Sequence, residues 1–198
     1  MTGTIRCGVN YASIRTCDIA NGEGVRVSLF VSGCTHHCKG CFNEDAWSFA
    51  YGKPFTREVE DGLLAALAPG YISGLTILGG EPMEPVNQQG LIGFLRRFRK
   101  QCGDSKTLWI YTGCVYDLDL LPPSGDALGM EVNSPHKRWR TEVTDDILRM
   151  TDVLVDGPFI ESLKDISLRF RGSSNQRIIN LRSGIVLAGP GEGARVSA

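Results

Sequence analysis

The sequence has no apolar run that approaches the roughly 18 residues a membrane-spanning helix needs. Its first residues, MTGTIRCGVNYASIRTC, lack the apolar core of a signal peptide. Neither sign of charge is in excess, since 21 Lys and Arg stand against 22 Asp and Glu. These absences give no reason to expect a membrane or a nucleic acid as partner, and they predict a cytoplasmic protein.

The seven Cys residues are an odd number, which does not suit the disulfide framework of a secreted protein. Cys7, Cys17, Cys102 and Cys114 are scattered, and each is predicted to be a small buried hydrophobic residue. The other three occupy one stretch of eight residues, which is the spacing of metal ligands.

The composition is that of an ordinary globular domain. Hydrophobic residues make up 42% of the 198 residues and charged residues 22%, so a sizeable core is available. We expect an extension at residues 1–16 and one main domain at 17–187. Within that domain, residues 122–140 are polar and turn-rich and predict an exposed insertion. The Gly-rich stretch 188–198 predicts a disordered tail.

Strand and helix patterns alternate along the main domain. Strands are predicted at 25–31, 75–78, 107–111 and 153–155, helices at 57–67, 88–101 and 145–150, a short helix near 115–121, and a hairpin from 177–181 and 184–187. Alternation of this kind predicts a parallel α/β sheet. We expect a single-domain α/β fold, an incomplete TIM-like barrel with its site at the carboxyl ends of the strands.

The central motif is Cys34-x3-Cys38-x2-Cys41, which follows the first predicted strand directly. A [4Fe–4S] cluster normally takes four thiolates. Three close thiolates would hold three irons and leave the fourth with an open coordination position. That iron would be free to bind a substrate or cofactor, so the motif favours chemistry over a purely structural role.

A zinc site is the alternative, in which His36 or His37 joins the three Cys as a fourth ligand. Zinc ligands usually come as two separated pairs, whereas these three Cys share one loop. The spacing therefore favours iron–sulfur, and the two His are predicted to be exposed loop residues.

Other candidates lie at the ends of predicted strands. Gly79 and Gly80 would let a ligand lie against backbone carbonyls, although such glycines also serve an ordinary strand-to-helix turn. Glu81 would add negative charge or cap the next helix. Phe42 would pack against a nucleobase or in the core. Asp156 would bind a cationic group or form a turn with the glycine that follows it.

One further polar stretch, residues 170–177, lies between predicted strand segments. Physical reasoning alone treats it as a solvated hairpin loop.

Two motifs together carry a family resemblance. The first is Gly33-Cys34-x3-Cys38-x-Gly40-Cys41-Phe42-Asn43 with Trp47, and the second is Gly79-Gly80-Glu81-Pro82. They resemble the radical S-adenosylmethionine (SAM) enzymes. More narrowly, the chain resembles the activating proteins of anaerobic ribonucleoside-triphosphate reductases. The narrower resemblance rests on stretches at 21–22, 29–32, 54–56, 153–157 and 168–176.

The resemblance implies cofactors and site residues. Cys34, Cys38 and Cys41 would hold one [4Fe–4S] cluster, and the open iron would bind the amine and carboxylate of SAM. Backbone at Gly40, Cys41 and Phe42 would lie near the adenine, with Gly79 and Gly80 near the methionyl amine. No acid–base residue is implied, because the cluster and SAM carry the radical chemistry.

It also implies an activity and partners. Reductive cleavage of SAM would give a 5′-deoxyadenosyl radical, which removes a hydrogen atom from a glycine in the reductase large subunit. A low-potential donor such as flavodoxin or ferredoxin would supply the electron. The alternatives are an activase of another glycyl radical enzyme, of the pyruvate formate-lyase type, and a non-catalytic zinc or iron–sulfur module.

Overall fold

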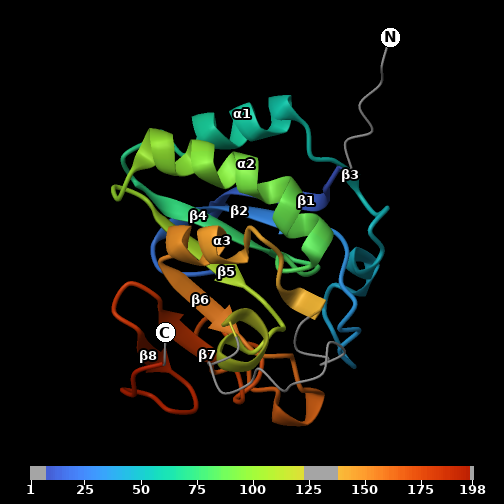
Figure 1. Cartoon of the computed structure of the whole chain (residues 1–198), viewed down its shortest axis with the longest axis vertical. Coiled ribbons are helices and arrows are strands. Elements are labelled where there is room, and N and C mark those ends of the chain that lie inside the picture. The colour runs from blue at the N-terminus through green and yellow to red at the C-terminus, as the bar shows by residue number, and fades with distance from the viewer. Residues whose placement is uncertain (1–7, 123–137, 197–198) are drawn as a thin grey trace.

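The computed structural model describes residues 8–122 and 138–196. Within these ranges eight strands form one sheet in the order β3-β1-β2-β4-β5-β6-β7-β8 (Figure 1). The strands are β1 (Asn10–Asp18), β2 (Val25–Val31), β3 (Lys53–Pro54), β4 (Ile72–Gly79), β5 (Thr107–Tyr111), β6 (Val153–Asp156), β7 (Arg177–Asn180) and β8 (Ile185–Ala188). Most of the predicted insertion, and Cys7, lie outside the described residues.

The sheet is mixed. Its centre, β2-β4-β5-β6, is parallel, and the strands that flank the centre on both sides pair antiparallel. The prediction of a single-domain α/β fold with parallel strands is therefore confirmed. The incomplete TIM-like barrel is not confirmed, because in the described ranges the sheet runs from one edge strand, β3, to another, β8.

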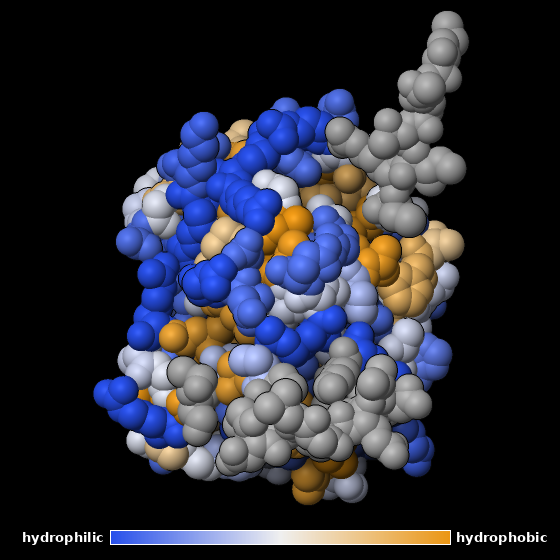
Figure 2. All heavy atoms as spheres, in the orientation of Figure 1, coloured by the Kyte–Doolittle hydropathy of each residue, from blue (hydrophilic) through white to orange (hydrophobic). Residues whose placement is uncertain are grey.

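Among the described residues, three α-helices cover one face of the sheet (Figure 1). They are α1 (Arg57–Ala66), α2 (Pro85–Cys102) and α3 (Thr144–Met150). Pro85 suits the first turn of α2, where its missing N–H loses no bond, and Gly103 ends the helix with a positive φ of 53°. The outward sides of α1 and α2 are largely hydrophilic (Figure 2).

The main core lies between these helices and the sheet. Alternate residues of the central strands point into it and are fully buried, as Val27, Leu29, Leu75 and Ile77 are. A smaller cluster of Trp109, Val153, Val155 and Ile178 occupies the opposite face. No helix in the described ranges is long and apolar enough to cross a membrane.

The structure differs from the sequence predictions at the amino-terminal edge. β1, which was not predicted, starts at Asn10 inside the expected extension and pairs with β2. Cys17 in this strand is exposed, so its predicted burial is wrong; Cys102 is half-buried and Cys114 is buried. Within the stretch predicted as a disordered tail, the N–H of Val196 donates to the carbonyl of Gly184 at 2.8 Å.

Candidate functional site

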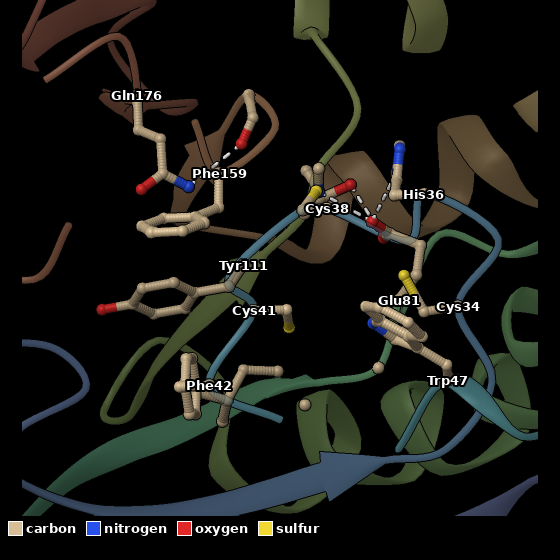
Figure 3. A pocket seen from close by; sticks show the side chains of 16 residues that line it. Cys34, His36, Cys38, Cys41, Phe42, Trp47, Glu81, Tyr111, Phe159 and Gln176 are labelled. Carbon is tan, nitrogen blue, oxygen red and sulfur yellow. Dashed lines mark hydrogen bonds and ion pairs between the residues drawn. The ribbon is translucent and has the colours of Figure 1, made fainter. Parts of the chain in front are cut away.

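The three clustered Cys lie in the loop that follows β2. Cys34 is buried, whereas Cys38 and Cys41 are half-buried. Backbone bonds fix the start of the loop, since the N–H of Gly33 donates to Ala46 at 2.8 Å and that of Cys34 to Trp47 at 3.0 Å. The three Cys side chains border the same pocket (Figure 3).

Four loops meet at this pocket, and each follows a parallel strand. They are the cysteine loop after β2, the glycine turn after β4, residues 112–113 after β5 and the loop that starts at Gly157 after β6. The carboxyl ends of parallel strands share one edge of a sheet, which is why these loops converge. The predicted location of the site at this edge agrees with the observed pocket.

Close backbone approach explains the two glycines of the turn after β4. Gly79 has a φ of +112°, and a Cβ there would lie 2.7 Å from the backbone N of Val31. A Cβ on Gly80 would lie 2.6 Å from the carbonyl O of Gly33. The turn also donates to the cysteine loop, from the N–H of Glu81 to Gly33 O at 2.8 Å. Both glycines line the pocket.

The Glu81 side chain is a buried hub between three loops. Its carboxylate accepts hydrogen bonds from the N–H of Met83 at 2.7 Å, the hydroxyl of Thr112 at 2.8 Å and the N–H of Gly113 at 2.7 Å. His36 of the cysteine loop lies 3.0 Å away from it. Glu81 therefore supplies negative charge at the site and also caps the turn that enters α2.

The two His residues of the cysteine loop differ in environment. His37 is exposed, as predicted, and stacks on Trp47 with ring centroids 4.5 Å apart. His36 is half-buried, contrary to the prediction, and stacks on Trp139 at 4.4 Å. Burial acts to lower the pKa of His36, but the hydrogen bond with Glu81 and the negative charges of Glu81 and Glu84 together outweigh burial and raise it.

A compact set of possible metal-ligand atoms includes one residue of the cysteine loop. Among the described residues, the set of ligand atoms that lie within 4.8 Å of one another belongs to His36, Glu81 and Cys114. A tetrahedral zinc ion with bonds of about 2.3 Å holds its ligand atoms less than about 4 Å apart. The three thiols of the cysteine loop do not form so compact a set within the described ranges.

Burial affects the protonation of two of the thiols, Cys34 and Cys38. It raises the pKa of Cys34 to about 12, and it also raises the pKa of Cys38. Both thiols are therefore protonated near neutral pH in the metal-free chain, and metal binding must release their protons.

Several pocket residues were not among the sequence candidates, with Tyr111 and Phe159 among them. Tyr111, Phe159 and Gln176 line the pocket (Figure 3). The hydroxyl of Tyr111 is buried and has no hydrogen-bond partner among the described residues. Tyr111 is the last residue of a predicted strand, at the sheet edge where the site was expected. This position alone could have indicated a place in the site. Nothing in the sequence pattern pointed to Phe159.

The polar stretch at 170–177 has a structural role that the sequence did not reveal. The side chain of Gln176 donates to the carbonyl of Gly157 at 3.0 Å, and that of Asn175 donates to Pro158 at 2.8 Å. These bonds hold the loop that carries Phe159 into the pocket.

Two other candidates have different surroundings. The cationic partner of Asp156 is Arg177 of the same chain, whose Nε donates to the carboxylate at 3.0 Å, and the N–H of Tyr116 also donates to it. Phe42 does not pack in the core, since it is 86% exposed at the pocket lining.

This chain is similar to known proteins over most of its length. The family described as "4Fe-4S single cluster domain" matches residues 20–179. The anaerobic ribonucleoside-triphosphate reductase-activating protein of Haemophilus influenzae is 40% identical over 172 residues, which are 86% of this chain and 97% of that protein. The chain belongs to the family of these activating proteins.

Other members of the activating-protein family are similarly close. The Escherichia coli K12 protein is 37% identical over 88% of this chain and 100% of its own length. The protein of phage T4 is 32% identical over 89% of this chain and 97% of its own. The matched cluster domain includes every residue that lines the pocket, from Cys34 to Gln176.

Proposed function

We propose that this protein is a radical SAM enzyme that generates a glycyl radical on an anaerobic ribonucleoside-triphosphate reductase. One observation carries the proposal: three thiols of one loop and the Gly79–Gly80 turn line the same pocket. The relatives of the chain are named as activating proteins of such a reductase, which supports this choice of partner.

Cys34, Cys38 and Cys41 are the proposed ligands of one [4Fe–4S] cluster. The donor set fits the group, because soft thiolates gathered in one loop are the ligands that iron–sulfur clusters take. With three protein ligands, the cluster would keep one iron free for SAM. When bound, it would supply the electron for reductive cleavage of SAM, which leads to removal of a hydrogen atom from the partner's glycine.

The remaining pocket residues bind and orient SAM in this proposal. Backbone at Gly40, Cys41 and Phe42 lies along the adenine, and carbonyls at Gly79 and Gly80 accept from the methionyl ammonium group. The position of both glycines in the pocket lining supports this role.

The chain must also keep water away from a reactive radical. Trp47, Tyr111 and Phe159 supply aromatic walls to the pocket. A second cavity of about 470 Å³ shares Cys41, Phe42 and Tyr111 with the first. Ile166 in its lining is 95% exposed, and exposed apolar residues at a cavity mouth suit the entry of a polypeptide.

Three further parts belong to the proposal. The electron comes from a low-potential donor such as flavodoxin or ferredoxin. The protein works in the cytoplasm. The radical SAM domain comprises residues 17–187, between the amino-terminal extension and the tail.

The test is anaerobic incubation of the reconstituted protein with SAM, a reductant and the reductase large subunit, followed by electron paramagnetic resonance. We expect a glycyl radical signal that depends on all components. A signal with pyruvate formate-lyase instead would establish the other activase. A colourless protein with one bound zinc would establish a non-catalytic module.

A further inference from the structure

A side chain at the start of α2 binds the backbone of the cysteine loop. The Oε1 atom of Glu84 accepts hydrogen bonds from both the N–H and the hydroxyl of Thr35, each at 2.7 Å. Thr35 directly follows Cys34, and Glu84 is 6% exposed. A buried carboxylate therefore binds the segment between Cys34 and Cys38.

The helix itself does not use this carboxylate. Glu84 occupies the N-cap position of α2, where a side chain often binds the free N–H groups of the first turn, but here it makes no capping bond. Burial of a carboxylate requires partners, and Glu84 finds them outside its helix. Its position is thus explained by the cysteine loop rather than by the stability of α2.

Neighbouring contacts hold the same loop along its first half. The side-chain amide of Asn87, three residues further along, donates to the carbonyl of Ser32 at 3.0 Å. The contact between Glu81 and His36 comes from three residues earlier. Side chains at 81, 84 and 87 therefore bind loop residues 32, 35 and 36 in a continuous series.

We propose that Glu84 is a positioning residue that sets the span from Cys34 to Cys38 before any metal binds. Ligation by these Cys rests on the proposed function. Three residues separate the two Cys, and a free loop of this length would lose conformational freedom each time a cluster formed. Bonds that order the loop in advance remove that cost from cluster binding.

Hydrogen exchange at the Thr35 amide of the metal-free protein tests the first part of this proposal. Removal of a charge-assisted bond in Glu84→Ala is expected to speed exchange about 10- to 100-fold. Glu84→Gln keeps an accepting oxygen and should restore most of the protection. The control Glu142→Ala removes an exposed carboxylate that bonds α2 at Gln89, away from the loop. Equal exchange in wild type and Glu84→Ala would overturn the proposal.

Iron uptake tests the second part. With limiting iron and sulfide, Glu84→Ala is expected to load clusters several-fold more slowly, while Glu84→Gln and Glu142→Ala load as the wild type does. Thermal unfolding of each metal-free variant checks the fold. If Glu84→Ala does not fold, Thr35→Val replaces it in the test, because this change removes the hydroxyl bond to Glu84 and keeps the N–H bond. Wild-type protein that binds no iron would refute the proposed function. Wild-type loading together with normal uptake in Glu84→Ala would refute the positioning role alone.

Discussion

The Oε2 atom of Glu81 lies 3.0 Å from the Nε2 atom of His36, and this contact joins the turn after β4 to the cysteine loop after β2. Glu81 is 1% exposed and His36 is packed between it and Trp139. The buried contact between Glu81 and His36 thus fixes the position of the cysteine loop, whose thiols border the pocket.

Replacement of Glu81 is expected to destabilise the metal-free protein. Gln at this position has one accepting oxygen for four donors, and its NH2 group would face the N–H of either Met83 or Gly113. We expect Glu81→Gln to lower the free energy of unfolding by about 3 kcal/mol, measured by urea denaturation. Glu142→Gln, at an exposed carboxylate, should leave it unchanged. A Glu81→Gln variant as stable as wild type would contradict the role of Glu81 as a hub.

Sequence patterns predicted the centre of the fold better than its edge. The apolar runs 25–31 and 107–111 coincide with β2 and β5, because strands in the middle of a sheet are buried on both faces. β1 has a polar sequence with mostly half-buried or exposed residues, and it exists because β2 offers a partner. Pairing of that kind leaves no apolar run to detect.

The parts of the site that follow directly after parallel strands could be predicted from the order of strands along the chain. Strand ends brought the cysteine loop and the glycine turn to one edge, as expected. Contacts between side chains far apart in sequence were not predictable. Glu81 and His36 are 45 residues apart, and Phe159 enters the pocket through bonds made by Asn175 and Gln176. The spacing of residues within one motif does not indicate which distant side chains will be in contact.

Gly80 tests the close approach of two loops. A Cβ at this residue would meet the carbonyl oxygens of Gly33 at 2.6 Å and Ala46 at 2.9 Å, both of them backbone atoms. We expect Gly80→Ala to lower the free energy of unfolding by about 1–3 kcal/mol. Gly62→Ala is the control, since nothing lies within 4 Å of a Cβ there on α1. That change should raise stability by about 0.5–1 kcal/mol. Thermal unfolding of both variants measures the contrast, and equal effects would count against the steric argument.

Phe42 tests the proposed contact with adenine. Its side chain is 86% exposed, so Phe42→Ala should change the free energy of unfolding by less than about 0.5 kcal/mol. Stacking between a base and an aromatic ring is worth about 1–3 kcal/mol, so SAM should bind the reconstituted variant roughly 5- to 150-fold more weakly. Equilibrium binding measures this, with Phe42→Tyr as the conservative control. An unchanged dissociation constant would remove Phe42 from the SAM site.

Asp152 links stability to pH. Burial acts to raise its pKa, but hydrogen bonds from Arg99, the Leu108 N–H and Arg182 outweigh burial and lower the pKa below 3.8. The stabilisation is therefore present above about pH 4 and is lost as the pH falls through the folded-state pKa. Asp152→Asn should lower the free energy of unfolding by about 2 kcal/mol at pH 7. Urea denaturation between pH 7 and pH 3 should show the difference from wild type shrinking; a constant difference would contradict the linkage.

The composition of the metal centre tests the central claim most directly. We expect anaerobically reconstituted protein to contain about four irons and four sulfides per chain, with an electron paramagnetic resonance spectrum that changes when SAM is added. Ser in place of Cys34, Cys38 or Cys41 should abolish the cluster, whereas Cys114→Ser should retain it. One bound zinc, or a cluster that needs a fourth Cys and ignores SAM, would contradict the account.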